Sequence, residues 1–109
     1  MTVTASQFYS ISPSDVEIAG VDYTDVLSTT ETVSGPSVAE ITTTDLTLSN
    51  VGVNTAVTEI FGREVAVGKG VLFRVSGQVL TRSYRVRVNV TTSSTPTRSL
   101  YRDVTFDCQ

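Results

Sequence analysis

The sequence has no histidine and no tryptophan, and it contains one cysteine, one methionine and three prolines among 109 residues. Without histidine, the chain lacks the usual base of Ser-His-Asp and Cys-His nucleophile systems and the commonest nitrogen ligand of metals. The single cysteine, Cys108, excludes an internal disulfide and is expected to be a small apolar residue of the last strand. We therefore expect no enzymatic activity, no required metal and no other cofactor.

Long hydrophobic runs are also missing. No segment approaches the roughly 18 to 20 apolar residues of a membrane-spanning helix, and the first residues lack the basic and apolar regions of a secretory signal. No glycine-rich loop has the spacing that binds phosphate, and residues 67–71, with two glycines around the single lysine, are typical of a hairpin turn. The sequence predicts a protein that is made in a cytosol, stays soluble and has no membrane partner.

The chain is rich in valine and threonine, and in several segments its apolar residues recur at every second position. Apolar residues make up 39% and charged residues 17% of the chain. In the strongest strand pattern Tyr84, Val86, Val88 and Val90 alternate with polar residues, so all four are predicted to point into a core. No stretch of ten residues keeps a helical period. The fold class predicted is all-β: an immunoglobulin-like β-sandwich of about seven antiparallel strands over residues 21–109, preceded by an N-terminal arm or edge element at residues 1–20.

The N-terminal arm carries three apolar residues next to a break. Phe8, Tyr9 and Ile11 precede Ser-Pro-Ser at residues 12–14, which interrupts any strand. We predict that these three side chains bind a partner, because aromatic anchors dominate contact energies. Two arrangements remain open: the arm docks on a neighbouring protein, or it folds back on its own sandwich as an edge strand.

Charge differs in sign between the two halves of the chain. Eight acidic residues and no basic ones precede residue 63, whereas all eight basic residues follow from Arg63 onward. Pairing between the halves would neutralise these charges within one sheet. Arg85 and Arg87 lie on the outward side of the strongest strand, and they are either part of a solvated face or a stripe that docks a partner. No aromatic residues are interleaved with the arginines, so we expect no nucleic-acid partner.

An acidic cluster near the N-terminus invites a calcium interpretation. Asp15, Glu17, Asp22 and Asp25 lie close together in the sequence. They lack the spacing of a calcium loop and its closing glutamate. A solvated acidic surface, or a contact face for a basic partner, is the better interpretation.

Short motifs in the second half resemble a known family. Residues 75–78 read Val-Ser-Gly-Gln, residues 84–93 read Tyr-Arg-Val-Arg-Val-Asn-Val-Thr-Thr-Ser, and Arg98 follows a polar turn. Near the start, Asp22-Tyr23 and residues 31–33, Glu-Thr-Val, add to the pattern. Over residues 21–107 the chain resembles the phage fibre–tail adaptor family, small Ig-like structural proteins of tailed bacteriophages. It departs from that family in lacking tryptophan and in having Ser-Thr-Pro-Thr before Arg98, where a glycine is usual.

This resemblance implies a structural protein of a phage virion. The expected role is a fibre–tail or head–tail adaptor, made in the host cytoplasm and present in many copies within a symmetric assembly. Its expected partners are other virion proteins of the tail, fibre, capsid or connector. Two alternatives remain: a capsid decoration or cement protein, and a cellular Ig-like binding or adhesion module, against which the missing signal peptide and disulfide count.

Overall fold

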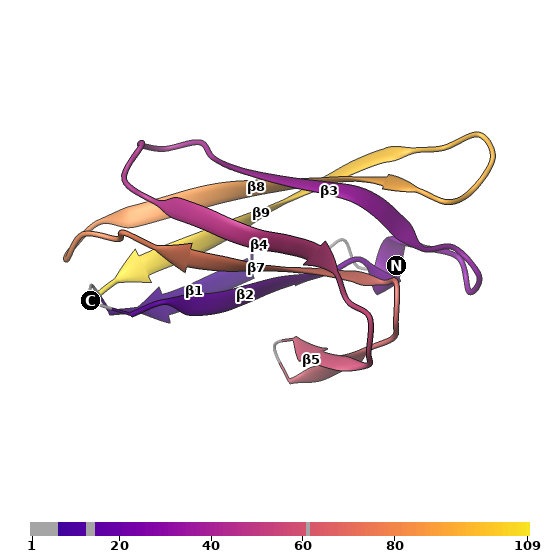
Figure 1. Cartoon of the computed structure of the whole chain (residues 1–109), viewed down its shortest axis with the longest axis horizontal. Helices are drawn as coiled ribbons and strands as arrows, with labels where there is room; N and C mark the ends of the chain where they lie inside the picture. The colour runs from indigo at the N-terminus through magenta and orange to yellow at the C-terminus, as the bar shows by residue number, and fades with distance from the viewer. Residues whose placement is uncertain (1–6, 13–14, 61) are drawn as a thin grey trace.

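The structure is a computed structural model that describes residues 7–12, 15–60 and 62–109. Within these residues the chain forms nine strands and one short 3₁₀ turn (Figure 1). The elements are β1 Gln7–Ile11, β2 Glu17–Asp22, η1 Thr24–Val26, β3 Val33–Glu40, β4 Thr47–Val53, β5 Thr58–Ile60, β6 Arg63–Val65, β7 Gly70–Ser76, β8 Ser83–Thr92 and β9 Ser99–Cys108. No helix in the described ranges is long and apolar enough to cross a membrane.

Seven of these strands form two sheets that enclose one core. One sheet has the order β1-β9-β8-β3, and the other has the order β2-β7-β4, while β5 and β6 form a separate hairpin. Neighbouring strands are antiparallel except β1 and β9, which run parallel. The prediction of an all-β, sandwich-like fold is confirmed.

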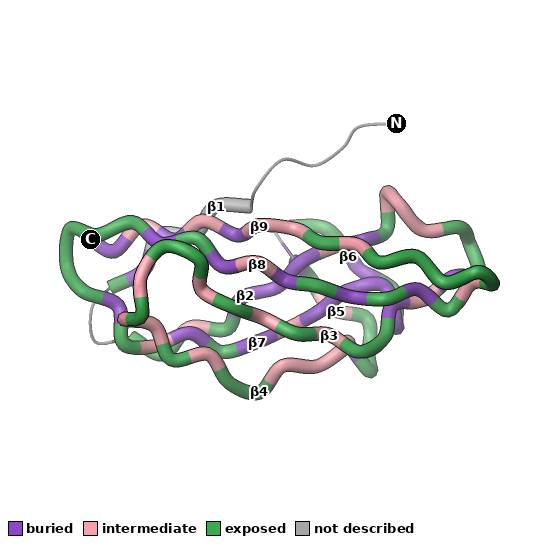
Figure 2. The backbone as a smooth tube through the Cα atoms, turned by 90° about the horizontal axis from the view of Figure 1, so that it is seen from above, coloured by how far each residue is buried: buried purple, intermediate pink, exposed green. Residues whose placement is uncertain are grey.

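The core lies between the two sheets and is built by the period-two pattern. Tyr84, Val86, Val88 and Val90 are all buried, as predicted, and β8 alternates between buried and exposed residues along its length (Figure 2). Phe73 of β7 meets Phe106 of β9 edge to face across the core, with ring centroids 6.3 Å apart. Burial of one such valine or phenylalanine stabilises the fold by about 1.5–3 kcal/mol. The other buried members are Ile11, Ala19, Val21, Tyr23, Val33, Val71, Val75, Val104 and Cys108.

The described part of residues 1–20 belongs to the two sheets. β1 is the edge strand beside β9, with Ile11 opposite Cys108, which is the second of the two arrangements left open by the sequence. β2 continues across residue 20, because Ala19 and Val21 both face the core. The side-chain amide of Gln78 donates hydrogen bonds to the carbonyl oxygens of Ser12 (2.5 Å) and Asp15 (2.8 Å), which ties the β1–β2 loop to the β7–β8 loop.

The β5–β6 hairpin packs on the outer face of the three-stranded sheet. A Cβ atom added to Gly20 would lie 3.1 Å from Ile60, and one added to Gly70 would lie 3.0 Å from Val65. The two bare backbone positions therefore make room for Ile60 and Val65, which are buried. Residues 67–71 do form a turn, but the expectation of a hairpin there is wrong. The turn joins β6 to β7, and each of these strands pairs with a different partner.

Asn54 holds that turn in place. Its Oδ1 accepts hydrogen bonds from the backbone N–H groups of Gly68 (3.1 Å) and Gly70 (3.0 Å). Its Nδ2 donates to the carbonyl oxygens of Val65 (3.2 Å) and Ala66 (2.9 Å). Asn54 is buried, so these bonds satisfy polar groups that water does not reach.

β3 and β4 are edge strands, and both are interrupted by bulges. The pairing of β3 with β8 shifts register between Ser34 and Ser37, where Gly35 has a φ of 58° and is followed by Pro36. The pairing of β4 with β7 shifts at Asn50, whose φ is 53°. Each bulge bends its strand and interrupts the regular row of backbone hydrogen-bonding groups along that edge.

A tyrosine fixes the corner where β7 leads into β8. The hydroxyl of Tyr84 accepts a hydrogen bond from the backbone N–H of Val79 (2.8 Å) and donates one to the Asp45 carboxylate (3.0 Å). Gly77 precedes this corner with a φ of 84°, and a Cβ atom there would lie 2.6 Å from the carbonyl oxygen of Asp45. Only glycine fits this position without a backbone shift.

Arg102 is the polar member of the inward row of β9. Its guanidinium carbon lies 5.7 Å from the ring centroid of Tyr23. The Tyr23 hydroxyl donates a buried hydrogen bond to the carbonyl oxygen of Val88 (2.9 Å), which joins the end of β2 to the opposite sheet. Burial raises the pKa of Tyr23, and the positive charge of Arg102 opposes that effect only in part.

Candidate functional site

The structure separates Ile11 from Arg85 and Arg87 among the five residues expected to bind a partner. Ile11 is 4% exposed and packs inside its own core. The backbones of Phe8 and Tyr9 lie in β1, opposite Thr105 and Phe106, but their side chains are outside the described residues. Arg85 and Arg87 lie on the outer face of the β1-β9-β8-β3 sheet, which we call the open face.

Arg87 is held in a fixed orientation on the open face. Its Nε donates to one carboxylate oxygen of Asp103 (2.9 Å) and its Nη2 donates to the other (3.3 Å). The same guanidinium stacks on the ring of Tyr101, with the carbon 4.4 Å from the ring centroid. The hydrogen bonds to Asp103 raise the pKa of Arg87. This bidentate and stacked geometry preorganises a cation beside an aromatic ring.

Arg85 and Tyr101 are two accessible residues of this face. Tyr101 is 56% exposed, and the side chain of Arg85 is exposed and makes no hydrogen bond or ion pair within the described ranges. Tyrosine and arginine are enriched among the residues that dominate binding energy at protein interfaces. The apolar Ile41, 45% exposed, lies beside Arg85, because its backbone N–H donates to the carbonyl oxygen of Arg85. The arrangement suits docking of another protein.

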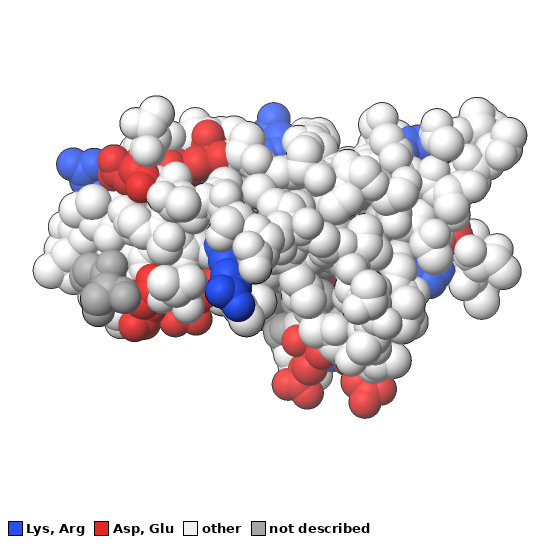
Figure 3. Space-filling model, viewed as in Figure 1, with Lys and Arg blue, Asp and Glu red and all other residues white. Residues whose placement is uncertain are grey.

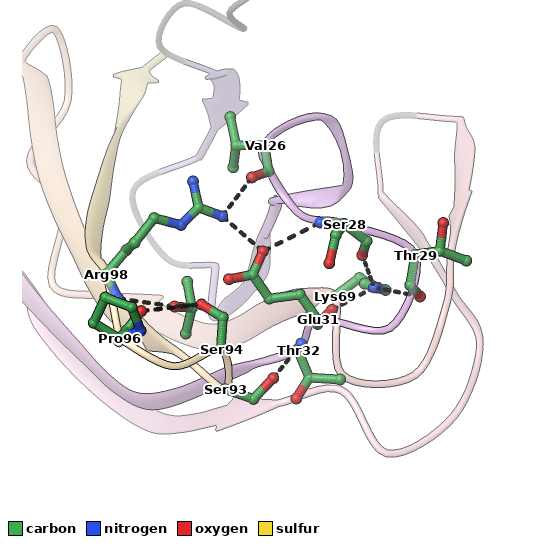
Figure 4. Close-up of polar contacts among 11 residues, drawn as sticks. Val26, Ser28, Thr29, Glu31, Thr32, Lys69, Ser93, Ser94, Pro96 and Arg98 are labelled. Atoms are coloured by element: carbon green, nitrogen blue, oxygen red, sulfur yellow. Dashed lines mark hydrogen bonds and ion pairs between the residues drawn. The ribbon is translucent and has the colours of Figure 1, made fainter.

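A second surface is the end of the sandwich where three loops meet, which we call the loop end: residues 23–32, residues 66–69 and residues 93–98. Figure 4 shows the polar contacts that join these loops. Glu31, in the first loop, accepts hydrogen bonds from the backbone N–H of Ser28 (3.1 Å) and from the Arg98 guanidinium (2.6 Å). Thr32 and Ser93 exchange two hydrogen bonds of 2.9 Å. The first and third loops are therefore fixed to each other.

Lys69 fixes the second loop to the first. Its ammonium group donates hydrogen bonds to three backbone carbonyl oxygens, those of Ser28 (2.8 Å), Thr29 (3.1 Å) and Glu31 (Figure 4). The side chain is only 9% exposed. A lysine so enclosed acts as a structural cation: it adds a second donor to the Ser28 carbonyl, which already accepts from the Glu31 backbone N–H, and it supplies a donor to the carbonyls of Thr29 and Glu31.

The environment of Glu31 keeps it ionised. The nearby Ser94 hydroxyl and the hydrogen bond from the Ser28 amide lower the pKa of Glu31 to about 2, against the opposing effect of burial. The rim of the loop end is rich in hydroxyl groups and exposed to solvent. Its exposed residues are Thr24, Ser28, Thr29, Thr30, Ala66, Val67, Ser93, Thr95, Pro96, Thr97 and Arg98.

Acidic residues of the first half form ion pairs with basic residues of the second half. We expected these pairs to lie within one sheet, and they do not. Of the four ion pairs in the described part of the chain, three join a basic residue of the second half to an acidic residue of the first. These are Arg63–Asp25, Arg82–Asp45 and Arg98–Glu31. In Figure 3 small acidic and basic patches are scattered over a mostly uncharged surface, so no large field of one sign covers that side.

Sequence reasoning missed four residues of these surfaces: Tyr101, Asp103, Glu31 and Lys69. Tyr101 and Asp103 occupy alternate positions of β9, so the period of two already places them outward. Their contact with Arg87 needed the β8–β9 register, in which Arg87 lies opposite Asp103. For Glu31 and Lys69 the sequence offers only one signal, a single lysine in a chain rich in arginine.

No protein-family model, no curated protein and no solved structure matches the chain. Within the described residues, no group of three or more acidic or cysteine side chains gathers as metal ligands, and this includes Asp15, Glu17, Asp22 and Asp25.

Proposed function

We propose that this chain is a non-enzymatic structural protein of a tailed-bacteriophage virion, an Ig-like interaction module that works as a fibre–tail or head–tail adaptor. The observation that carries the proposal is the open face, where Tyr101 and Arg85 are exposed and Arg87 is held in place by Asp103. An adaptor needs a rigid surface of this composition, since preorganised side chains lose less entropy on binding.

The strand order supports the Ig-like topology. In an Ig constant-type domain, strands A, B, E and D form one sheet and C, F and G form the other. Here β2, β7 and β4 take the places of B, E and D, and β3, β8 and β9 take those of C, F and G. Tyr84 near the start of β8 resembles the tyrosine corner of such domains, because its hydroxyl bonds to the backbone five residues upstream.

The residues that resemble the phage family support the same proposal. Gly77 and Gln78 build the β7–β8 corner, and Tyr84 closes it. The resemblance therefore rests on residues with structural duties and not only on common β-strand composition. The loop end gives an adaptor a second rigid surface at one end of the strands, and we assign it to another virion protein.

The test is whether the protein is part of the particle. Phage particles from the strain that encodes the chain are purified and their proteins are identified by mass spectrometry. We expect the chain to be present at a fixed copy number per particle, and a cryo-EM map to place it between the tail and another component. A map with the sandwich on the capsid surface would instead favour a decoration protein. Absence of the chain from purified particles would contradict the proposal.

A further inference from the structure

The open face carries its charges in two rows of opposite sign. β8 presents Arg85 and Arg87 outward, and β9 presents Asp103 and Asp107 outward. In the β8–β9 register, Arg87 lies opposite Asp103 and Arg85 lies opposite Thr105, the residue between the two aspartates. Neighbouring strands are about 4.8 Å apart, so a positive row runs directly beside a negative row.

We propose that the open face docks on the open face of a second copy of this chain, about a twofold axis that runs parallel to the strands between β8 and β9. Such an axis places β8 of each copy over β9 of the other at the same level. Arg87 of each copy then lies over Asp103 of the other, which forms a square of alternating charges. Arg85 lies over Thr105, between Asp103 and Asp107. Every contact occurs twice, as a twofold interface requires.

The pattern of charge selects a second copy over an unrelated partner. A partner surface of one sign would face one row of opposite charge and one row of like charge, and the like row would repel it. A copy of the same face, rotated by the twofold axis, faces opposite charge in both rows. The exposed ring of Tyr101 lies on the same row as the aspartates and adds an aromatic contact at the end of the charge square.

The area of the face sets the strength of the contact. With about 3.3 Å per residue along the strands and about 4.8 Å between them, the four strands present a plane of roughly 500 Å². Two copies would bury about 1,000 Å², which is the lower end of specific interfaces. We therefore expect a reversible dimer with a dissociation constant in the micromolar range, a strength that many identical contacts in a symmetric particle would reinforce.

The outer face of the other sheet is less suited to this contact. The β5–β6 hairpin already covers part of it, with Ile60 over Gly20 and Val65 over Gly70. Its exposed charge, Arg74, has no aspartate opposite it in the pairing with β2 or β4, where its neighbours are Ile18 and Ser49. This face therefore lacks the two complementary rows, and it supplies a matched control position.

This inference refines the proposed function by naming the partner of the open face, and its test in solution does not depend on the particle. Sedimentation equilibrium is measured from about 5 to about 500 μM protein at about 50 mM salt. We expect the wild-type chain to dimerise, and Arg85→Glu to weaken dimerisation at least about tenfold. Arg74→Glu carries the same charge change on the other sheet and should leave it unaltered. Raising the salt to about 500 mM should weaken the wild-type dimer, because ions screen the paired rows.

A charge swap tests the geometry. Arg85→Glu alone places a carboxylate between Asp103 and Asp107 of the other copy, and Asp107→Arg alone places an arginine diagonally next to Arg85 of the other copy. Each variant by itself should dimerise at least about tenfold more weakly than the wild type, with a melting temperature that shows it is folded. An equal mixture of the two should form a heterodimer, since residue 85 of one chain then meets the opposite charge at residue 107 of the other, and the reverse contact keeps its wild-type pair.

Three results would overturn the inference. The first is a wild-type chain that stays monomeric up to about 500 μM. The second is equal weakening of the dimer by Arg74→Glu and Arg85→Glu. The third is a mixture of folded Arg85→Glu and Asp107→Arg chains that remains monomeric. None of these results bears on whether the chain is found in phage particles, so the two proposals fail separately.

Discussion

The carboxylate of Glu31 and the guanidinium of Arg98 lie 2.6 Å apart, although 67 residues separate them in the chain. The Glu31 side chain is 4% exposed and that of Arg98 is 47% exposed, so the buried carboxylate is paired with a guanidinium that lies at the solvent-exposed rim. Removal of either side chain leaves the remaining one without its partner, and the polar network of the loop end is then incomplete.

This pair predicts an acid-sensitive step in stability. The pKa of Glu31 falls from 4.5 to about 2 on folding, because the nearby Ser94 hydroxyl and the hydrogen bond from the Ser28 amide favour the ionised form. The unfolded chain binds the proton more readily, so the stabilisation is present above about pH 4.5 and is lost as the pH falls towards 2. We expect the melting temperature of Glu31→Gln to depend less on pH in this window than that of the wild type. Glu64→Gln, in the exposed hairpin, is the control, and an unchanged slope in Glu31→Gln would contradict the prediction.

Lys69 should react slowly with amine reagents. Its ammonium group donates to three carbonyl oxygens and is 9% exposed, so a reagent reaches it only when the loop end opens. Since it is the only lysine, mass spectrometry can follow the reaction without ambiguity. We expect labelling at least about tenfold slower in the native protein than in the urea-unfolded chain. Equal rates under the two conditions would show that the loop end is open in solution.

The hydroxyl of Tyr84 should contribute to stability through the β7–β8 corner. Tyr84→Phe removes the acceptor for the part-buried Val79 amide and one of the two donors to Asp45, which keeps only its contact with Arg82. We expect a loss of about 1–3 kcal/mol in the free energy of unfolding, measured by urea denaturation. Tyr101→Phe, on the exposed face, should lie within about 0.5 kcal/mol of wild type. Similar values for the two variants would argue against the corner.

Val88 tests the core assignment of β8. Val88→Asp places an unpaired carboxylate between the sheets and should cost at least about 3 kcal/mol, enough to abolish soluble expression. The neighbouring Asn89→Asp points outward and should express normally. Soluble Val88→Asp protein with an unchanged melting temperature would refute the inward position.

The β5–β6 hairpin should depend on Ile60. Ile60→Ala removes the side chain that fills the space over Gly20 and Gly70. We expect it to destabilise the packing of the hairpin on the sheet by about 2 kcal/mol or more. Trypsin should then cut after Arg63 more than about tenfold faster than in the wild type, because cleavage follows the open population. Val57→Ala, 61% exposed, is the control. Equal cleavage in the two variants would show that Ile60 does not hold the hairpin.

The sequence predicts the inward rows of β7, β8 and β9 because a period of two needs only the strand itself. It does not predict how β1 joins β9, since five residues without a regular pattern carry no register information. The packing of the β5–β6 hairpin is not predicted for another reason. It depends on the absence of side chains at Gly20 and Gly70, and an isolated glycine does not indicate which residues pack against it. Glu31, Lys69 and Arg98 meet only after three loops converge, so their contact follows from the topology and not from local spacing.

The bulges at Gly35 and Asn50 also bear on how the protein behaves when it is abundant. A regular edge strand offers unpaired backbone groups to any neighbour, and sheets can then grow from chain to chain into fibrils. β3 and β4 each break that line, one with a glycine and a proline and the other with an asparagine in the left-handed region. At this side of the sandwich, contact between chains must therefore use side chains on a face. Such contact stops at a defined number of copies, whereas growth along an edge has no natural end.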